Sequence, residues 1–178
     1  MNVSPIFATF LATDMLDVPT HAMSNWYNDQ TANDSKVPLD LSQPEFAELF
    51  AAVQDRFNKI ASDILCVDNV KLFEAWVNTG DNERTSLCHT HPTSTVVGVY
   101  YPYVEGDVGR LELTSPVSAL EFALPTSLSG YNVFNSNVWQ VEPVTGLLVM
   151  FPSWVQHVVR ASAPTATRVS IALNGRIE

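Results

Sequence analysis

Basic residues are scarce in this sequence. Nine Lys and Arg stand against 19 Asp and Glu among 178 residues, which gives a formal net charge of −10. A chain this acidic repels phosphate backbones, so nucleic acid is not expected as a partner. Cysteine is scarce as well, since the chain has two, Cys66 and Cys88, and no CxxC spacing. Two are too few for a disulfide scaffold, so we expect two free thiols that are buried or half-buried.

Long hydrophobic runs are absent too. No apolar run reaches the roughly 18 residues that span a bilayer. The apolar first 15 residues lack the basic start and the small-residue cleavage site of a secretory signal. We therefore expect no membrane partner, an N-terminal segment that belongs to the fold, and a location in the cytoplasm. Repeats and linkers are also missing, so residues 1–178 are expected to form a single domain.

The chain does have enough apolar residues for a core. Hydrophobic residues make up 46% of it and charged residues 16%, which excludes general disorder. Periodicity predicts a helix over 42–65, with Pro44 in its first turn and a capping box formed by Ser42 and Glu45. A weaker helix is expected over 20–29 and a loop over 28–40. The apolar stripe of the main helix comprises Phe46, Phe50, Val53, Phe57, Ile60 and Ile64.

Beyond residue 67 the hydrophobic period falls to two, which is typical of strands. Turn residues recur about every ten positions and separate the runs. The expected strands span 70–78, 85–91, 95–103, 110–113, 137–141, 146–151, 155–160 and 167–174. Many short strands with regular turns predict a mostly β fold, a sandwich or jelly roll. Residues 67–178 form this expected core, and the N-terminal strand and helices of residues 1–66 pack on its sheet.

Three of the four histidines lie in this β region. His89 and His91 form an HxH pair. Residues two apart on a strand point to the same face, so both imidazoles could bind one metal ion. His157 is distant in sequence, and a pair with a distant single histidine is a common layout for a metal site at the mouth of a β barrel. The alternative is partly exposed histidines with no shared role.

The last expected strand offers a site for a carboxylate. Arg168 and Ser170 share one face, where a guanidinium and a hydroxyl suit carboxylate binding. Arg168 follows His157 at the spacing of a short strand, a turn and a return, so the two side chains can lie side by side. The alternative is a polar strand face turned to solvent.

These residues and their neighbours resemble a small family of 2-oxoglutarate/Fe(II) dioxygenases, known mostly from marine bacteria and their phages. The resemblance covers residues 67–174. Its most specific parts are HTHP, the YY pair, and FPSWxxH followed by RxSxxxN. The segments that carry it are WVN at 76–78, HTHP at 89–92, GVYY at 98–101, GRL at 109–111, GLLVMFPSW at 146–154, His157, and RVSIALN at 168–174.

The resemblance implies a double-stranded β-helix, a form of jelly roll, that holds Fe(II) in its mouth. His89, His91 and His157 would be the metal ligands and the catalytic centre. With O2, the enzyme would decarboxylate the co-substrate 2-oxoglutarate to succinate and CO2 and hydroxylate a small or peptidyl substrate.

The resemblance also implies a binding site for 2-oxoglutarate. Arg168 would bind its distal carboxylate, with Ser170 beside it. Tyr101 would bond the same carboxylate, and Tyr100 is the alternative if the strand parity differs by one. The expected lining residues of the pocket are Asn78 and Asn174.

One position departs from the pattern of the wider superfamily. His91 stands where an HxD or HxE carboxylate is expected, so three neutral imidazoles leave the iron one negative charge short. The dianion 2-oxoglutarate could supply that charge, whereas superfamily members that bind a halide there have a small residue. The alternative is that His91 is not a ligand and an acidic residue is. The candidates nearest in sequence are Asp81, Glu83 and Glu112.

Other functions stay open at this point. A cupin-like dioxygenase with three histidines and no co-substrate fits the HxH pair, but cupins usually have a Glu shortly after it, and residues 92–97 contain none. A non-catalytic jelly roll that binds a partner is the second alternative. Zinc would favour hydrolysis, although no general base lies nearby in the sequence.

Residues 114–136 are expected to form a lid that selects the substrate. The expected aromatic walls of the site are Trp76, Tyr103, Trp139 and Trp154.

Overall fold

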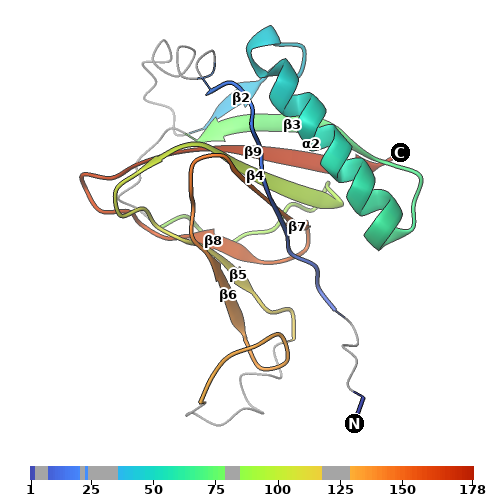
Figure 1. Ribbon diagram of the computed structural model, residues 1–178, viewed down its shortest axis with the longest axis vertical. Coiled ribbons are helices and arrows are strands. Elements are labelled where there is room, and N and C mark those ends of the chain that lie inside the picture. The colour runs from blue at the N-terminus through green and yellow to red at the C-terminus, as the bar shows by residue number, and fades with distance from the viewer. Residues whose placement is uncertain (3–7, 21–22, 24–35, 79–84, 118–128) are drawn as a thin grey trace.

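The protein is described here by a computed structural model that covers residues 1–2, 8–20, 23, 36–78, 85–117 and 129–178 (Figure 1). Two antiparallel sheets form its centre, with strand orders β1-β7-β4-β9-β3-β2 and β6-β5-β8. The mostly β architecture predicted from the sequence is confirmed. The strands are β1 (Ala12–Met15), β2 (Val37–Leu39), β3 (Val70–Asn78), β4 (Val96–Glu105), β5 (Leu111–Thr114), β6 (Val138–Val141), β7 (Leu147–Pro152), β8 (His157–Val159) and β9 (Thr167–Ile177).

The predicted helix is present in three joined parts. A 3₁₀ turn, η1 (Pro44–Phe46), leads into α2 (Ala47–Ile60), which continues as a π-helical turn, η2 (Ala61–Leu65). The predicted capping box is wrong, because the Ser42 hydroxyl donates to Asp40 Oδ1 at 2.8 Å instead. Ile64 is 46% exposed, unlike the rest of the predicted stripe. A π-helical turn contains more residues than an α-helical turn, and the difference rotates Ile64 away from the sheet.

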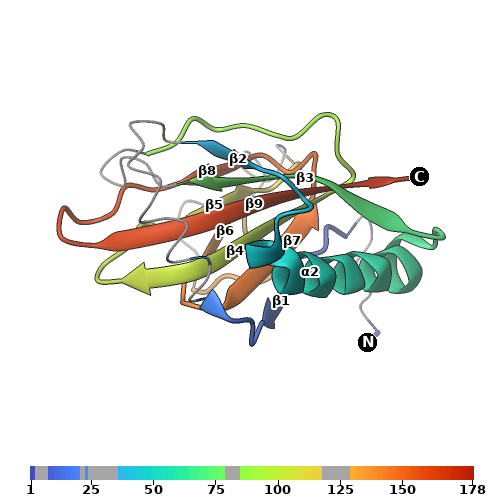
Figure 2. The ribbon, with the colours of Figure 1, turned by 90° about the horizontal axis from the view of Figure 1, so that it is seen from above.

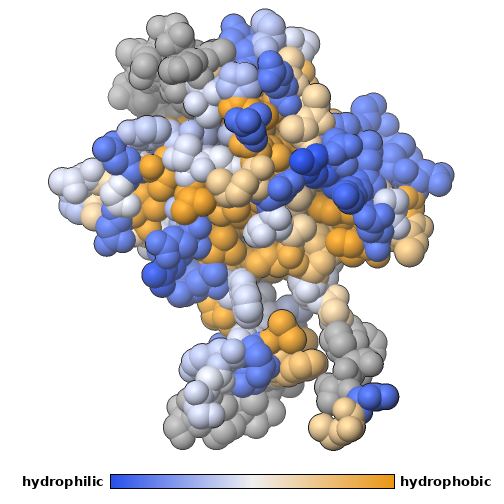
Figure 3. Space-filling view, in the orientation of Figure 1, coloured by the Kyte–Doolittle hydropathy of each residue, from blue (hydrophilic) through white to orange (hydrophobic). Residues whose placement is uncertain are grey.

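Two hydrophobic cores lie on opposite sides of the larger sheet. Figures 1 and 2 show α2 across one side and the smaller sheet on the other. The helix-side core contains Phe57 and Ile171, and the core between the sheets contains Tyr101 and Phe151. The apolar stripe of α2 is buried against the sheet, and hydrophilic residues cover the outer side of the helix (Figure 3). The expected packing of helix on sheet is therefore confirmed.

Strand β9 separates the two cores by simple alternation. Val169, Ile171 and Leu173 pack on the helix side. The intervening residues, Arg168 and Asn174 among them, are therefore directed between the sheets, as the sequence pattern predicts.

Strand β3 does not follow one alternation along its length. A β-bulge lies between Leu72 and Glu74 in its pairing with β9. Leu72 before the bulge and Ala75 after it both pack in the helix-side core. The bulge thus turns Glu74 and Trp76 to the face of the sheet opposite the helix, where Trp76 is buried and Glu74 is exposed, because an extra residue reverses the parity of the strand.

Several expectations need correction. No strand covers 85–91; within it only an isolated bridge joins His89 to His157. The expected loop 28–40 ends in β2, and residues 28–35 lie outside the described part of the chain, as does nearly all of the expected helix 20–29. Cys66 and Cys88 are free but exposed. Among the described residues, no helix is long and apolar enough to cross a membrane.

Candidate metal centre

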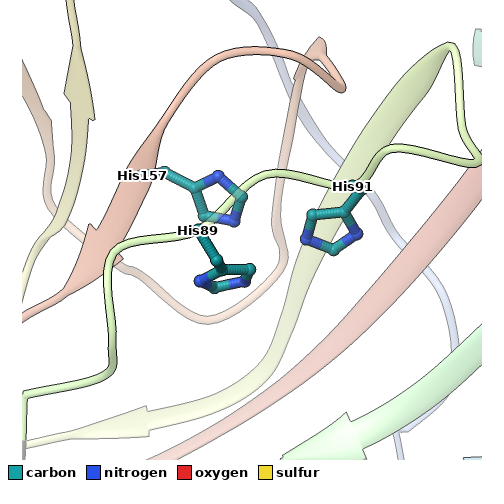
Figure 4. A group of neighbouring side chains, drawn as sticks. All are labelled: His89, His91 and His157. Atoms are coloured by element: carbon teal, nitrogen blue, oxygen red, sulfur yellow. The ribbon is translucent and has the colours of Figure 1, made fainter.

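Three histidines gather between the two sheets. His89 and His91 come from the segment before β4, and His157 begins β8 (Figure 4). One nitrogen from each ring lies within 4.8 Å of the others, a grouping that could hold a metal ion. The ring centroids are 4.3 Å apart for His89 and His157 and 5.2 Å apart for the other two pairs.

Backbone hydrogen bonds hold this segment in place although it is not a regular strand. His89 and His157 exchange two backbone bonds, of 3.1 and 3.0 Å, and His91 N donates to Ser153 O at 2.9 Å. Ser153 in turn donates its hydroxyl to Ser94 O at 2.6 Å. The HxH pair is therefore fixed against β8 and the turn before it, so both rings can face His157.

The hydrogen bonds of His89 and His157 define their tautomers. Nδ1 of His89 lies 2.8 Å from Leu87 O, and Nδ1 of His157 lies 3.1 Å from Val155 O. A carbonyl oxygen only accepts, so each Nδ1 carries the proton. Nε2 of each ring then carries the lone pair that a metal requires.

The imidazole ring of His91 is held by two side chains, those of Asn174 and Trp76. Its Nδ1 lies 2.8 Å from Asn174 Oδ1, and the Asn174 amide donates to Glu74 Oε2 at 2.7 Å. The ring stacks on Trp76, with centroids 5.6 Å apart and planes 12° from parallel. His91 is 8% exposed, and its Nε2 is buried with no hydrogen-bond partner among the described residues. A buried ring nitrogen without a partner is costly unless it binds a ligand.

Burial keeps the rings of His91 and His157 neutral. It lowers the pKa of His157 to about 4, and the neighbouring His89 and His91 add to the effect. Burial also lowers the pKa of His91, although the bond to Asn174 opposes it. Neutral imidazoles with their second nitrogens bonded to acceptors are the donor set that divalent iron, zinc, copper or nickel accepts. The residues present therefore fit a transition-metal ion.

Arg168 and Tyr101 form a second polar group, which lies beside the core between the two sheets. Arg168 is 9% exposed, and its Nη1 donates to Gly109 O at 3.0 Å. The Tyr101 hydroxyl is buried and has no hydrogen-bond partner among the described residues. Burial raises the pKa of the Tyr101 phenol, and the Arg168 charge acts in the opposite direction. A buried guanidinium near an unpartnered hydroxyl fits a carboxylate.

The structure brings most of the remaining predicted residues together. Ser170 is buried on the inner side of β9 and accepts from Asn78 Nδ2 at 3.5 Å. Asn78 also accepts from Trp76 Nε1 at 3.2 Å. Tyr100 is the exception, because it packs in the helix-side core. Neighbouring residues of β4 face opposite sides, which separates Tyr100 from the site and leaves Tyr101 in it.

Of the carboxylates considered as ligands, Glu112 is described by the structure, and it does not join the histidines. Glu112 accepts from Arg160 Nε at 2.6 Å and from Gln140 Nε2 at 2.7 Å. Asp81 and Glu83 lie outside the described residues. Sequence reasoning missed Glu74, which reaches His91 through Asn174. The face of β3 to which the Glu74 side chain points is set by the bulge, and no local signal in the sequence marks that bulge.

A cavity of about 600 Å³ lies between the N-terminal segment and the ends of the smaller sheet. Phe151 lines it and also meets the His157 ring edge-on at 5.0 Å. Residues 114–117, 133, 134 and 136 of the predicted lid contribute to its wall, as does Trp139. Tyr103 and Trp154 are exposed, and Trp76 is the predicted wall residue that touches a histidine.

Comparison with known proteins agrees with this geometry. The family model described as "Putative 2OG-Fe(II) oxygenase" matches residues 74–174, which include all three histidines and Arg168. No curated protein sequence matches the chain.

Solved structures show a common fold at low sequence identity. A Pseudomonas putida prolyl-4-hydroxylase has 16% identity and a TM-score of 0.63, over 94% of this chain and 92% of that one. HygX from Streptomyces hygroscopicus, with nickel, 2-oxoglutarate and hygromycin B bound, has 14% identity and a TM-score of 0.55, over 95% and 82%. A Trichoplax adhaerens prolyl hydroxylase, in complex with a peptide fragment of hypoxia inducible factor, has 12% identity and a TM-score of 0.59, over 93% and 83%.

The family match covers more than half of the chain, and the fold is the jelly roll shared with these oxygenases. The cofactors of the chain are accordingly Fe(II) and 2-oxoglutarate, and the histidine cluster could hold the metal. This chain belongs to the 2OG-Fe(II) oxygenase family of oxidoreductases.

Proposed function

We propose that His89, His91 and His157 hold Fe(II) through their three Nε2 atoms. The observation that carries this assignment is the shared tautomer. Every Nδ1 faces an oxygen acceptor, so every Nε2 has a free lone pair, and the rings converge. Two of these rings are buried, which keeps them neutral at neutral pH.

Arg168 and Tyr101 are proposed to bind the distal carboxylate of 2-oxoglutarate. Arg168 and Ser170 lie two residues apart on β9, so both side chains face the space between the sheets, as does the Tyr101 side chain. Gly109 O accepts from Arg168 Nη1 and restrains the guanidinium. Binding there would satisfy the Tyr101 hydroxyl, a buried polar group that has no partner among the residues described.

The proposed reaction is hydroxylation of a second substrate. The bound iron supplies activation of O2 coupled to decarboxylation of 2-oxoglutarate to succinate. The residues of this chain orient the reactants: the three imidazoles leave metal positions open, and Arg168 sets the direction from which 2-oxoglutarate reaches them. Phe151 and Trp76, packed against His157 and His91, exclude water from that side of the centre.

The substrate is proposed to be a small molecule or a peptidyl side chain. One similar structure holds hygromycin B and another holds a peptide, so this fold accommodates both classes. His89 is exposed, which leaves one side of the centre accessible from solvent. A cytoplasmic location and the absence of nucleic-acid partners stay predictions from the sequence. This family assignment favours the 2-oxoglutarate-dependent enzyme over the cupin-like and non-catalytic alternatives.

An anaerobic titration tests this function. Metal-free protein receives Fe(II) and then 2-oxoglutarate, and the visible charge-transfer band of the iron–2-oxoglutarate chelate is recorded. The band is expected in the wild type and is lost in His157→Ala and Arg168→Ala. Arg176→Ala is the matched control, because Arg176 lies on the same strand but is exposed and pairs with Glu178.

The titration separates the alternatives. Iron binding without a band in the wild type contradicts the 2-oxoglutarate site and favours the cupin-like enzyme. Absence of iron binding contradicts the metal centre and favours a non-catalytic module. A band that survives Arg168→Ala contradicts the carboxylate assignment alone.

A further inference from the structure

Glu74 reaches the metal centre through one amide. Asn174 donates from Nδ2 to Glu74 Oε2 at 2.7 Å, and its Oδ1 accepts from His91 Nδ1 at 2.8 Å. A carboxylate, an amide and an imidazole thus form one chain of hydrogen bonds, called here the Glu74 relay. It ends on the histidine that stands where the wider superfamily has a carboxylate ligand.

The charge of Glu74 gives this relay a direction. A carboxylate only accepts hydrogen bonds, so the Asn174 amide must turn its NH2 group to Glu74 and its oxygen to His91. That oxygen requires a donor, which places the imidazole proton on Nδ1. With the amide reversed, two oxygens would face each other, and an NH2 group would face the ring. The Glu74 relay therefore leaves the lone pair on Nε2 of His91.

The backbone is built to bring these residues together. Glu74 lies directly opposite Asn174 in the pairing of β3 with β9, immediately after the bulge. Without the bulge Glu74 would face the helix-side core, together with Leu72. Trp76, two residues further along β3, stacks on the His91 ring and restrains its plane. The same bulge thus directs both the relay and the stacking ring toward His91.

We propose that Glu74 is a positioning residue of the three-histidine centre. It fixes the tautomer of His91 through Asn174, and it supplies a negative charge close to a ligand set that has none of its own. An acceptor behind the distal nitrogen makes an imidazole a better donor to a metal, and a carboxylate strengthens that effect. The charge part of this inference rests on the proposed metal centre, whereas the tautomer part concerns the metal-free protein.

Two measurements on the same variants test the relay. Nitrogen-15 NMR of the histidine rings in metal-free protein at about pH 7.5 reports the tautomers. Calorimetry with Co(II), an air-stable substitute for Fe(II), reports the affinity. Glu74→Gln keeps the shape but can both donate and accept. We expect a mixture of His91 tautomers in that variant, in place of one Nδ1–H form, and a rise of about tenfold in the Kd for Co(II).

The control is a carboxylate of the same kind elsewhere. Glu105 is exposed and accepts a bond from the Tyr103 hydroxyl, so Glu105→Gln makes the same chemical change away from the centre. It is expected to leave tautomers and affinity as in the wild type. The double variant Glu74→Gln/Asn174→Asp moves the negative charge next to His91, with the new amide donating to it. It is expected to restore both the tautomer and the affinity.

The outcomes distinguish the relay from a structural role. A Glu74→Gln protein with the wild-type tautomer and Co(II) affinity overturns the proposal, even if its stability is lower. Failure of the double variant to restore the tautomer also counts against it. If the wild type binds no Co(II), the proposed metal centre and the charge part fail together, and the tautomer in metal-free protein still decides whether the relay exists.

Discussion

At the scale of single residues, the site depends on which atom of each side chain is already bonded. In each of the three histidines, Nδ1 donates a hydrogen bond to an oxygen of the protein, which leaves Nε2 to bind a metal. Tyr101 has the opposite arrangement, since its buried hydroxyl, near the Arg168 charge, has no hydrogen-bond partner in the part of the chain that the structure describes. Each group lacks the one partner that Fe(II) or 2-oxoglutarate would supply.

Arg168→Lys tests whether the guanidinium is required rather than its charge. Lysine keeps the charge but loses the planar fork that binds a carboxylate through two bonds. We expect the Kd for 2-oxoglutarate of the Fe(II)-loaded protein to rise about tenfold, which corresponds to about 1.4 kcal/mol. The anaerobic charge-transfer titration measures it, with Arg176→Lys on the same strand as the control. Equal affinity in both variants would mean that Arg168 does not bind the carboxylate.

Glu112 gives a pH prediction at the same scale. Bonds from Arg160 and Gln140 hold its pKa below the usual 4.5. The unfolded chain then takes up the proton first as the pH falls. The stability from Glu112 is therefore present above pH 4.5 and is lost as the pH falls toward the lowered pKa.

Glu112→Gln removes this contribution. The variant is expected to be less stable than the wild type at pH 7 by about 1 kcal/mol, and the difference should narrow below about pH 4.5. Urea unfolding at a series of pH values measures both curves. A difference that stays constant across that range would contradict the assignment. Iron binding is expected to stay unchanged, since Glu112 is bonded away from the histidines.

At the scale of elements, the alternation of side chains along a strand predicted which residues face the site wherever the strand is regular. Arg168 and Ser170 face the inner space because β9 alternates without interruption there. Tyr100 and Tyr101 could not be separated from the sequence, because both are buried and the parity of β4 is set by its partners. Glu74 was missed for a related reason: a bulge depends on the pairing of two strands, and a single strand sequence does not encode it.

The histidine pair shows the same limit. HxH was predicted to lie on a strand, and the rings do share one side, but bonds to β8 and to Ser153 hold the segment instead of a ladder. The predicted residues were therefore brought together for a different structural reason. The helical segment ends at Leu65 as predicted, but the π-helical form of its last turn, which exposes Ile64 and precedes Cys66 with a φ of 56°, could not be predicted from the apolar stripe.

Gly175→Ala tests the contact between α2 and the sheet. A Cβ at Gly175 would lie 2.7 Å from atoms of Phe57 and Val70, which are both fully buried. Overpacking of this kind is expected to lower the free energy of unfolding by about 1–3 kcal/mol. Chemical denaturation measures it. Gly130→Ala is the control, because no atom of the described residues lies within 4 Å of a Cβ placed there. An equal loss in both variants would contradict the packing argument.

At the scale of the whole molecule, the larger sheet serves two purposes. Its helix side is an apolar core that includes Phe57, Ile171 and Leu173, and its other side carries polar residues among apolar ones. The change of period near residue 67 predicted where the long run of strands begins, although β1 and β2 before it also join the larger sheet. The metal centre lies where the second sheet closes over the polar side, so the rigid helix-side core supports it.

Metal binding should therefore stabilise the whole fold. A ligand present at a hundredfold excess over its Kd adds about 2.7 kcal/mol to the stability of the folded state. For a chain of this size, that is a rise in Tm of roughly 5–10 °C. Thermal unfolding with and without Co(II) measures it, and excess chelator should abolish the effect. The same rise in His91→Ala would contradict the role of that ring.

The central claim is that three histidine Nε2 atoms, without a protein carboxylate, hold the iron. An anaerobic crystal structure of the protein with Fe(II) and 2-oxoglutarate tests it most directly. The account predicts iron bound to Nε2 of His89, His91 and His157, with the far carboxylate of 2-oxoglutarate on Arg168 and Tyr101. Iron held by a carboxylate in place of His91, or through any Nδ1, would contradict it.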